Sequence, residues 1–269
     1  MASKFLLNAN QAAEARIQNA AIDRVAAAMS GQFARALSKQ MNAAADAVAT
    51  GGSVAGAVLL NSAGLNAAFL RTYKTAAPLV GSRIIQQAKS LHGSRHIIAK
   101  ADGVPVLQLW NAQIARFIAA FGAQRVQQVN QTTIDQIARI ISNAYNDAAT
   151  VIEVQKRIRD AIPAFSAVRS RAIARTETHA GAMGGSLSAA RVIEIDTSKR
   201  WNATEDGRAR PDHADADGQT RDLEQPFTVG DDNLQHPGDP SATAENVVNC
   251  RCVLRSEERR VGKECSSAC

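Results

Sequence analysis

Four side chains late in the sequence have the types needed to bind a metal ion. Cys250 and Cys252 can supply thiolates, while His213 and His236 can supply imidazoles, and together they would form a tetrahedral zinc set. The spacing matches no compact zinc motif, because a single residue separates the cysteines. The sequence therefore favours the alternative, in which the cysteines pack as small hydrophobic side chains and the histidines lie in polar loops. No cofactor is expected, and zinc remains a candidate.

The cysteines Cys250 and Cys252 are not expected to form a disulfide with each other. In a strand their Cα atoms would lie about 6.6 Å apart, near the limit of disulfide geometry. Side chains two residues apart share one face of a strand, which permits joint ligation of a metal. Asn249, which precedes them, can hold a turn into this closing strand. Nothing in this pattern requires an oxidising compartment.

A calcium site is a second candidate in the same region. His213, Asp215, Asp217, Gly218 and Glu224 fall at positions one, three, five, six and twelve of an EF-hand loop. Histidine is a poor first ligand for a hard cation, and the preceding segment RARPDH contains a proline where the entering helix should end. A tight Asp-Gly turn is the simpler interpretation.

An enzyme is not expected. His213 with a nearby aspartate could act as a general base, yet no Gly-x-Ser-x-Gly elbow, His-Glu-x-x-His pair or phosphate-binding glycine loop accompanies it. The run GAMGGS, Gly181–Ser186, falls inside a predicted helix and indicates a close contact between helices. The alternative is a metal-dependent or toxin-like enzyme seated around His213, His236, Cys250 and Cys252.

Charge is distributed unevenly along the chain. Residues 1–100 carry 11 Lys and Arg against 3 Asp and Glu, whereas residues 201–254 carry 4 against 11. The basic part favours contact with a polyanion such as DNA, and without interleaved aromatic residues such binding would not depend on sequence. The equally open alternative is that the arginines pair with the acidic segment. The basic residues on predicted helices are Lys156, Arg157, Arg159, Arg169, Arg171, Arg175 and Arg191.

The elements that position these residues are predicted to be mostly helices. Large apolar residues recur at three- to five-residue steps over residues 11–41, which places them on one helix face, and Gly51-Gly52 ends this element. A second helical region is expected over residues 63–93, with an interruption at Pro78. A third is expected over residues 106–121.

Two capping signals predict the helices that follow. A capping box at Thr133 predicts one helix start, and a second box formed by Thr150 and Glu153 predicts a break and a new start. Pro163 is expected to stop that helix, and another is expected from Ser166.

Membrane insertion and secretion are not expected. Residues 47–70 contain no charge, but they are rich in Gly, Ala, Ser and Asn, which oppose insertion into hydrocarbon. A flexible joint between helices is the favoured interpretation. Near the start of the chain, Lys4 precedes only three apolar residues, too few for a secretion signal.

The residue pattern changes after Val192, from long helical segments to short strands and turns. Segments VIEID, KRWNAT and CRCVL are typical of short strands, TAENVV of a short helix, and the Asp-, Gly- and Pro-rich stretches between them of turns. The predicted fold class is therefore α+β, with a mainly helical N-terminal region followed by a small α+β C-terminal domain with short strands.

The end of the chain is set apart from this domain. Residues 255–265, RSEERRVGKEC, resemble the in-frame translation of a common sequencing adaptor. We therefore interpret residues 255–269 as an artefact appended where the natural chain was truncated, at about Leu254, and give Cys265 and Cys269 no functional weight.

Six motifs occur in a specific order: IARTETHA, KRWNATEDGRARPDH, DG, PF, HPGDP and NCRC. Their succession resembles the head-morphogenesis domain of tailed-phage minor head proteins, the family that includes phage Mu protein F. The resemblance covers residues 130–254. Residues 1–129 form a separate Ala-rich helical region before this domain, and residues 255–269, the interpreted artefact, follow it.

The resemblance implies a capsid-internal, portal-associated protein that acts in procapsid assembly and in genome packaging or release. Its implied partners are the portal protein, procapsid components and non-specifically contacted double-stranded DNA, with no membrane and no small-molecule substrate. Its implied location is the procapsid or virion interior, and the host bacterial cytoplasm during assembly. No catalytic residue or cofactor carries over. The residues that match the motifs are Arg175, Thr176, Glu177, Lys199, Trp201, Asp206, Arg208, Arg210, His213, Asp217, Gly218, Phe227, Pro237, Gly238, Asp239, Pro240, Asn249, Cys250, Arg251 and Cys252.

Elementary chemistry gives these motif residues structural roles. Trp201 can anchor a small core that has few other large side chains. Arg175 and Glu177 lie two apart on a helix and point to different sides, so they can fix the helix against two loops. The Asp-Gly pair at 217–218 and the Pro-Gly pair at 237–238 are typical of tight turns.

Overall fold

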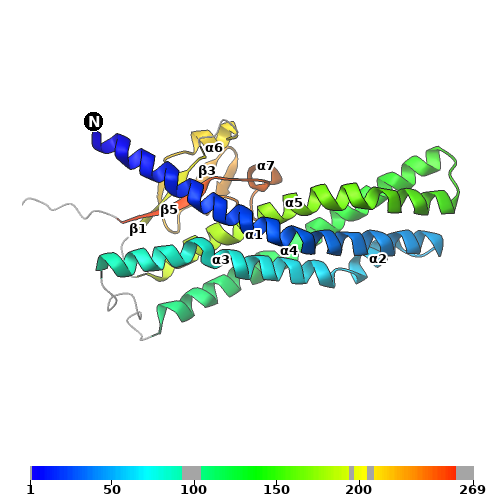
Figure 1. Ribbon diagram of the computed structural model, residues 1–269, viewed down its shortest axis with the longest axis horizontal. Helices are drawn as coiled ribbons and strands as arrows, with labels where there is room; N and C mark the ends of the chain where they lie inside the picture. Colours follow the sequence, from blue (N-terminus) through cyan, green and yellow to red (C-terminus); the bar gives the residue numbers. More distant parts are fainter. Residues whose placement is uncertain (1, 93–103, 194–196, 205–208, 259–269) are drawn as a thin grey trace, which may run out of the picture.

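A bundle of long helices makes up most of the molecule. The computed structural model describes residues 2–92, 104–193, 197–204 and 209–258. The long helices are α1 (Ala2–Ala49), α3 (Ala63–His92), α4 (Val106–Asn146) and α5 (Val151–Val192), and a short helix α2 (Val54–Leu60) follows α1 at one end of the bundle. Figure 1 shows that they run roughly side by side and give the molecule an elongated shape.

The small strand-containing domain lies beside the opposite end of the bundle (Figure 1). Strand β1 (Thr197–Asn202) is the centre of a three-stranded antiparallel sheet in the order β2-β1-β5. A separate antiparallel hairpin joins two further strands. The remaining elements of this domain are α6 (Pro211–Asp215), β2 (Thr220–Asp222), β3 (Phe227–Val229), β4 (Asp232–Leu234), α7 (Ala244–Val247) and β5 (Val253–Glu258). The predicted α+β fold class is confirmed.

Helix α5 connects the bundle to the small domain. It packs against α1, α3, α4 and β5, and every residue from Thr176 to Ala190 is buried. A helix that is buried on all sides carries mainly apolar or small residues, which explains the Ala, Gly and Ser content of this segment. The exceptions, Glu177 and His179, have hydrogen-bond partners. The motif IARTETHA therefore lies in the most enclosed part of the protein.

The glycine run in α5 allows a close approach of two helices, as the sequence predicted. A Cβ atom on Gly185 would lie 2.3 Å from the carbonyl oxygen of Ala77 in α3, and one on Gly181 would lie 3.0 Å from the ring of Tyr73. Side chains at these positions would force α3 away from α5.

One of the two predicted capping boxes is present in the structure. The box at Thr150 is confirmed, because its side chain accepts from the backbone of Glu153 and the Glu153 carboxylate accepts from the Thr150 backbone. The box at Thr133 is wrong. Thr133 is buried inside α4, where its hydroxyl donates to the carbonyl of Val129 one turn earlier, so α4 continues without a break.

Neither proline interrupts its helix, which corrects two predictions. Helix α3 continues through Pro78 and α5 continues through Pro163. An internal proline removes one backbone hydrogen bond and crowds the preceding turn. Packing compensates on both sides of each proline, since Ala77 and Val80 are buried beside the first, and Ile162 and Ser166 beside the second.

The closing strand differs from its prediction in both position and length. It begins at Val253, so the cysteine pair lies in the non-strand segment before it, and residues 255–258 continue the pairing with β1. The predicted boundary after Leu254 therefore falls within β5. Because backbone hydrogen bonds pair strands of almost any sequence, this pairing does not decide where the natural sequence ends. Residues 194–196 of VIEID and 259–269 of the tail lie outside the described residues.

The predicted domain boundary at residues 129 and 130 falls inside α4, so no linker separates the two regions there. The predicted end of the first helix before Gly51-Gly52 is confirmed, with Gly51 at a φ of 69°.

No single described helix is long and apolar enough to cross a membrane, although α2 and α3, bent by 44°, pass that test as a pair by length and composition. Some of their large apolar residues, such as Leu65 and Phe69, are buried in the bundle, whereas Leu59, Leu60 and Leu70 are exposed.

Trp201 anchors the core of the small domain, as the sequence predicted. Its side chain is completely buried, its ring meets the ring of Phe227 edge-on with centroids 5.5 Å apart, and it packs in one cluster with Met183 and Leu187 of α5. The domain core is therefore continuous with the face of α5.

Candidate functional site

Three of the four predicted metal ligands lie together. His213 comes from α6, and Cys250 and Cys252 come from the segment between α7 and β5. The Nδ1 atom of His213 lies 3.3 Å from Sγ of Cys252 and 3.7 Å from Sγ of Cys250, and the three atoms lie within 4.8 Å of one another. All three side chains are buried and both thiols are free. We call these residues the Cys-His cluster.

Side chains from several elements hold the backbone that carries the two cysteines. The carbonyl of Arg251 accepts hydrogen bonds from Asn19 of α1 at 3.0 Å and from Thr204 at 2.5 Å. The carbonyl of Cys252 lies 2.8 Å from Nε2 of His179 in α5. Since this segment forms no strand, these side chains satisfy backbone groups that would otherwise be buried without partners.

Asn249 sets the direction of the same segment. Its φ of 56° lies in the left-handed region, which asparagine tolerates better than most residues, and its backbone N–H donates to the hydroxyl of Thr176 at 3.1 Å. Arg210, at the start of α6, donates to the carbonyl of Val248 at 2.6 Å. The motif residues Thr176, Arg210 and Asn249 therefore act together to position the Cys-His cluster.

The orientation of the His213 ring is fixed by its neighbour Asn246. The Asn246 amide nitrogen donates to the carboxylate of Asp232 at 2.9 Å and to the carbonyl of Val229 at 3.2 Å. Its Oδ1 atom therefore faces His213 Nε2, 3.2 Å away, and accepts a hydrogen bond from it. The other ring nitrogen, Nδ1, faces both thiols. Hydrogen bonds from Thr243 and Asn246 also lower the pKa of Asp232.

The two thiols differ in acidity. A hydrogen bond from Cys252, aided by the charge of Arg210, lowers the pKa of Cys250 although burial opposes it. The same hydrogen bond, together with burial, raises the pKa of Cys252. The first proton lost from the pair therefore comes from Cys250, and the neighbouring thiol stabilises the resulting thiolate.

A cavity of about 270 Å³ adjoins the Cys-His cluster. All three cluster residues line it, together with Arg175 and Arg210. Arg175 also lies 3.4 Å from Asp23 of α1. The cavity therefore brings three arginines, Arg175, Arg210 and Arg251, beside two thiols and an imidazole. This arrangement is suited to a thiolate-bound cation and an anionic or neutral small ligand.

The fourth predicted ligand, His236, is not part of this cluster. Its ring centroid lies 5.9 Å from that of Phe117 in α4, and its Nδ1 lies 3.0 Å from the carbonyl of Pro237. It lines a second cavity of about 280 Å³ together with Arg191 and Asp239. Burial lowers the pKa of His236, so its imidazole is held neutral.

The calcium-ligand pattern is not assembled. Glu224 accepts two hydrogen bonds from Arg191, at 2.9 and 2.8 Å, and Asp217 accepts one from the backbone of Ala203. Gly218 has a φ of 78°, in keeping with the tight Asp-Gly turn that the sequence favoured. These residues form structural contacts instead of a single ligand sphere.

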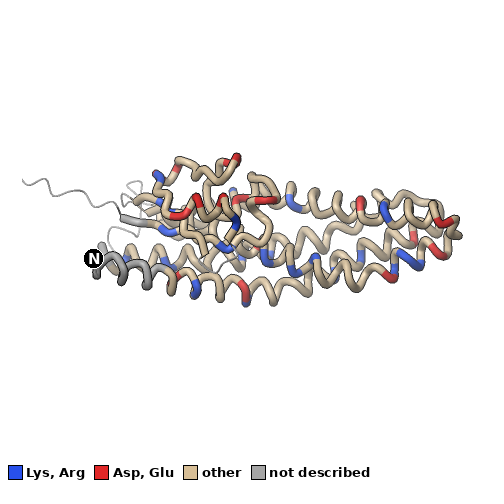
Figure 2. Tube along the Cα trace, turned by 90° about the horizontal axis from the view of Figure 1, so that it is seen from above, with Lys and Arg blue, Asp and Glu red and all other residues tan. Residues whose placement is uncertain are grey.

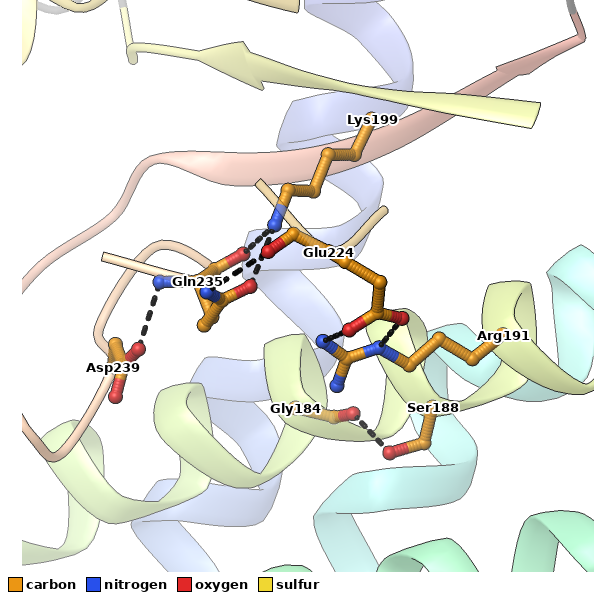
Figure 3. Close-up of polar contacts among 7 residues, drawn as sticks. All are labelled: Gly184, Ser188, Arg191, Lys199, Glu224, Gln235 and Asp239. Atoms are coloured by element: carbon orange, nitrogen blue, oxygen red, sulfur yellow. Dashed lines mark hydrogen bonds and ion pairs between the residues drawn. The ribbon is translucent and has the colours of Figure 1, made fainter. Parts of the chain in front are cut away.

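A polar network fixes the hairpin and its following loop to the rest of the domain (Figure 3). Nζ of Lys199 donates to the backbone carbonyl of Gln235 at 2.9 Å and to its side-chain oxygen at 3.0 Å. The carboxylate of Asp239 accepts from the Gln235 backbone at 2.8 Å. Burial lowers the pKa of Lys199 to about 8, an effect that Arg191 reinforces. Lys199 and Asp239 thus stabilise one loop from opposite sides.

Glu177 makes a second buried network, between helices. Its carboxylate accepts hydrogen bonds from Tyr73 of α3 and from Arg125 of α4, the latter at 2.9 and 2.6 Å. The predicted separation of Arg175 and Glu177 to different sides agrees with their different partners. The prediction that both contact loops is wrong, because Glu177 meets two helices. Tyr73, Arg125 and Asn246 were missed, since no local motif marks them.

The remaining motif residues have mainly structural surroundings. Gly238 has a φ of 71°, and a Cβ atom there would lie 2.6 Å from Nδ1 of His179. Phe227, Pro237 and Pro240 are buried. Asp206 and Arg208 lie outside the described residues.

The fold and the site together define an α+β protein in which a helical bundle carries a small domain held by buried polar networks. The family model described as "Phage Mu protein F like protein" matches residues 121–255, about half of the chain, and the chain belongs to this family. Membership identifies a phage head morphogenesis protein and indicates a virion or procapsid location. The predicted family resemblance is confirmed.

A curated relative is similar to part of the chain. The uncharacterized protein YqbB of Bacillus subtilis (strain 168) is 23% identical over 155 residues, which cover 56% of this chain and 50% of the relative. The chain thus spans about half the length of this relative. No solved structure matches the chain.

Proposed function

We propose that this protein is a minor head protein that lies inside the phage head, associates with the portal, and acts in procapsid assembly and in genome packaging or release. The observation that carries the proposal is the family match over residues 121–255, which spans α4 from Phe121 onward, all of α5, and the small domain as far as Arg255 in β5. The motif residues within this match have structural surroundings that support an architectural role.

Buried polar contacts support that role. Glu177 is bound by two helices, and Lys199 and Asp239 hold one loop between them. A charged group buried with its partners fixes the position of the elements that supply it, because separating the partners is costly. We therefore propose that the domain is a rigid building block with no catalytic step.

The far end of the bundle offers a surface for the portal. Tyr145, Val151 and Ile152, at the turn between α4 and α5, are 82%, 55% and 77% exposed. We call these three residues the bundle tip; Figure 1 places this turn at the end of the bundle away from the small domain. Large apolar side chains gathered in the open are typical of a protein contact. We assign the bundle tip to the portal protein.

Non-specific DNA binding receives less support. Arg157, Arg159, Arg175 and Arg191 form ion pairs with Asp147, Asp46, Asp23 and Glu224. Figure 2 shows acidic residues interspersed with basic ones along the bundle. Carboxylates beside the arginines weaken attraction to phosphate, so DNA contact is the second candidate.

Co-purification tests the proposal. The tagged chain is produced together with the portal protein of the same phage, and the complex is isolated at moderate salt. Recovery of portal protein, and detection of the chain in purified procapsids or virions, is the expected result. Absence from both particles contradicts the proposed function.

A further inference from the structure

We propose that His213, Cys250 and Cys252 bind a zinc ion, with a fourth coordination position open to the adjoining cavity. This inference is independent of the proposed function, because it rests on the geometry of the Cys-His cluster alone. It differs from the four-ligand set that the sequence suggested, since His236 lies in another cavity.

The distances within the cluster fit a tetrahedral zinc ion. With a Zn–N bond of about 2.0 Å, a Zn–S bond of about 2.3 Å and tetrahedral angles, a ligand nitrogen and sulfur lie about 3.5 Å apart. The distances from His213 Nδ1 to the two sulfur atoms are 3.3 and 3.7 Å. The two sulfur atoms lie within 4.8 Å of each other, against about 3.8 Å in a tetrahedral site. A side-chain movement of about 1 Å or less therefore places one ion at bonding distance from all three atoms.

The hydrogen-bond partners of the ligand residues are arranged as in protein metal sites. A histidine ligand donates its other ring N–H to a fixed acceptor, which sets the tautomer and the ring orientation. Asn246 provides that acceptor for His213 Nε2 and is itself held by Asp232. This contact leaves Nδ1 as the ring nitrogen that faces the two sulfur atoms.

The backbone on the cysteine side is equally constrained. His179 holds the carbonyl of Cys252, and Thr176 holds the N–H of Asn249. Thiolates are the ligands that favour zinc over magnesium or calcium. On binding, each thiol that carries a proton releases it to solvent, and its sulfur lone pair forms the bond to zinc.

Three protein ligands leave one position of a tetrahedral ion for another group. The cluster lines the cavity of about 270 Å³ that also contains Arg175 and Arg210. We assign the fourth position to a water molecule or a small anion in that cavity, where the arginines that line it favour negative charge. The ion would also join α6 to the segment before β5 and so stabilise the small domain.

The test uses the full chain carrying Cys265→Ser and Cys269→Ser, which removes the cysteines of the tail as other zinc ligands. This parent protein is stripped with a chelator and titrated with Zn²⁺, and bound metal is measured by elemental analysis. One ion per chain is expected, together with a higher melting temperature in the zinc-loaded protein. The cluster is unchanged in this parent protein. If the chelator-stripped parent binds no zinc, the proposal is overturned.

Matched variants of the parent identify the ligands. Cys250→Ser and Cys252→Ser are each expected to lower retained zinc about tenfold or more, and Asn246→Ala to weaken affinity by about 10- to 100-fold. His236→Gln alters a buried histidine outside the cluster and is expected to retain zinc. Full zinc retention in a variant that carries both Cys250→Ser and Cys252→Ser, or loss of zinc in His236→Gln alone, overturns the assignment.

Cobalt distinguishes an open site from a closed one. Co²⁺ bound to the parent is expected to show thiolate-to-metal charge-transfer absorption, which is lost in the cysteine variants. Added azide is expected to change the visible spectrum by taking the fourth position. A cobalt spectrum that azide leaves unchanged overturns the open position.

Discussion

The hydroxyl of Tyr73 on α3 donates a hydrogen bond to Oε2 of Glu177 on α5, and both side chains are buried. Arg125 on α4 donates to the other carboxylate oxygen. Burial, and then the Glu177 charge, raise the pKa of Tyr73 well above its ordinary value, so the phenol remains a donor. One carboxylate therefore connects three helices at the motif IARTETHA.

Replacing Glu177 with Gln should destabilise the protein strongly. The change leaves the guanidinium of Arg125, only 13% exposed, without its counter-charge. Breaking a buried ion pair in this way costs about 3–5 kcal/mol, and urea unfolding followed by circular dichroism measures it. The matched control is Asp147→Asn, which removes one partner of an exposed pair with Arg157 and should cost less than about 1 kcal/mol. Equal losses of unfolding free energy in the two variants would show that Glu177 does not hold the three helices together.

Replacing Gly185 with Ala should also destabilise the protein, through backbone crowding. The new Cβ atom would lie 2.3 Å from the carbonyl oxygen of Ala77, which no side-chain rotation relieves. Overpacking of this kind costs about 1–3 kcal/mol. The control is Gly122→Ala in α4, where the nearest atom would lie 3.9 Å away and the helix should gain up to about 1 kcal/mol. Thermal unfolding of both variants checks the prediction, and a stabilised Gly185→Ala protein contradicts it.

Local signals predicted the features that depend on a few neighbouring residues. The capping box of Thr150 and Glu153, the turn at Asn249 and the tight helix contact at Gly185 all follow from backbone chemistry. Trp201 was predictable because large apolar residues are scarce in this domain. Each of these features is a property of a short segment.

Long-range packing explains the predictions that failed. A helix breaker such as Pro163 is tolerated when the helix on either side is held by burial, and this burial comes from residues distant in sequence. The same limit applies to the site. Tyr73 and Arg125 lie 104 and 52 residues from Glu177. His213 and His236 are equivalent by residue type, and the chain path alone brings one of them to the cysteines.

Acidification should weaken the protein through His236. Burial is the first cause of its lowered pKa, with Lys199 and Arg191 acting in the same direction and Asp239 against it. The unfolded chain therefore binds a proton where the folded protein does not. Stability from this group is fully present above the unfolded pKa of about 6.5 and falls as the pH drops below it.

The comparison of wild type with His236→Gln isolates this effect. Glutamine keeps a polar side chain but does not titrate, so the variant should lose less stability between about pH 7 and about pH 5. Urea midpoints measured at each pH provide the test. Parallel pH dependences in the two proteins would mean that His236 is protonated equally in the folded and unfolded states.

Truncating the bundle tip should separate portal binding from folding. Tyr145 and Ile152 are 82% and 77% exposed, so Tyr145→Ser with Ile152→Ser should change stability by only about 0.5 kcal/mol. If the portal covers these side chains, losing an aromatic anchor should cost about 2 kcal/mol or more of binding free energy, which makes the complex weaker by about 30-fold.

Val168→Ser on α5 is the control, because Val168 is 65% exposed but lies outside the tip. Affinities of the purified chains for portal protein measure the difference. A wild-type chain that does not bind portal contradicts the proposed partner, whereas equal binding by wild type and the tip variant keeps the partner and refutes the assigned surface.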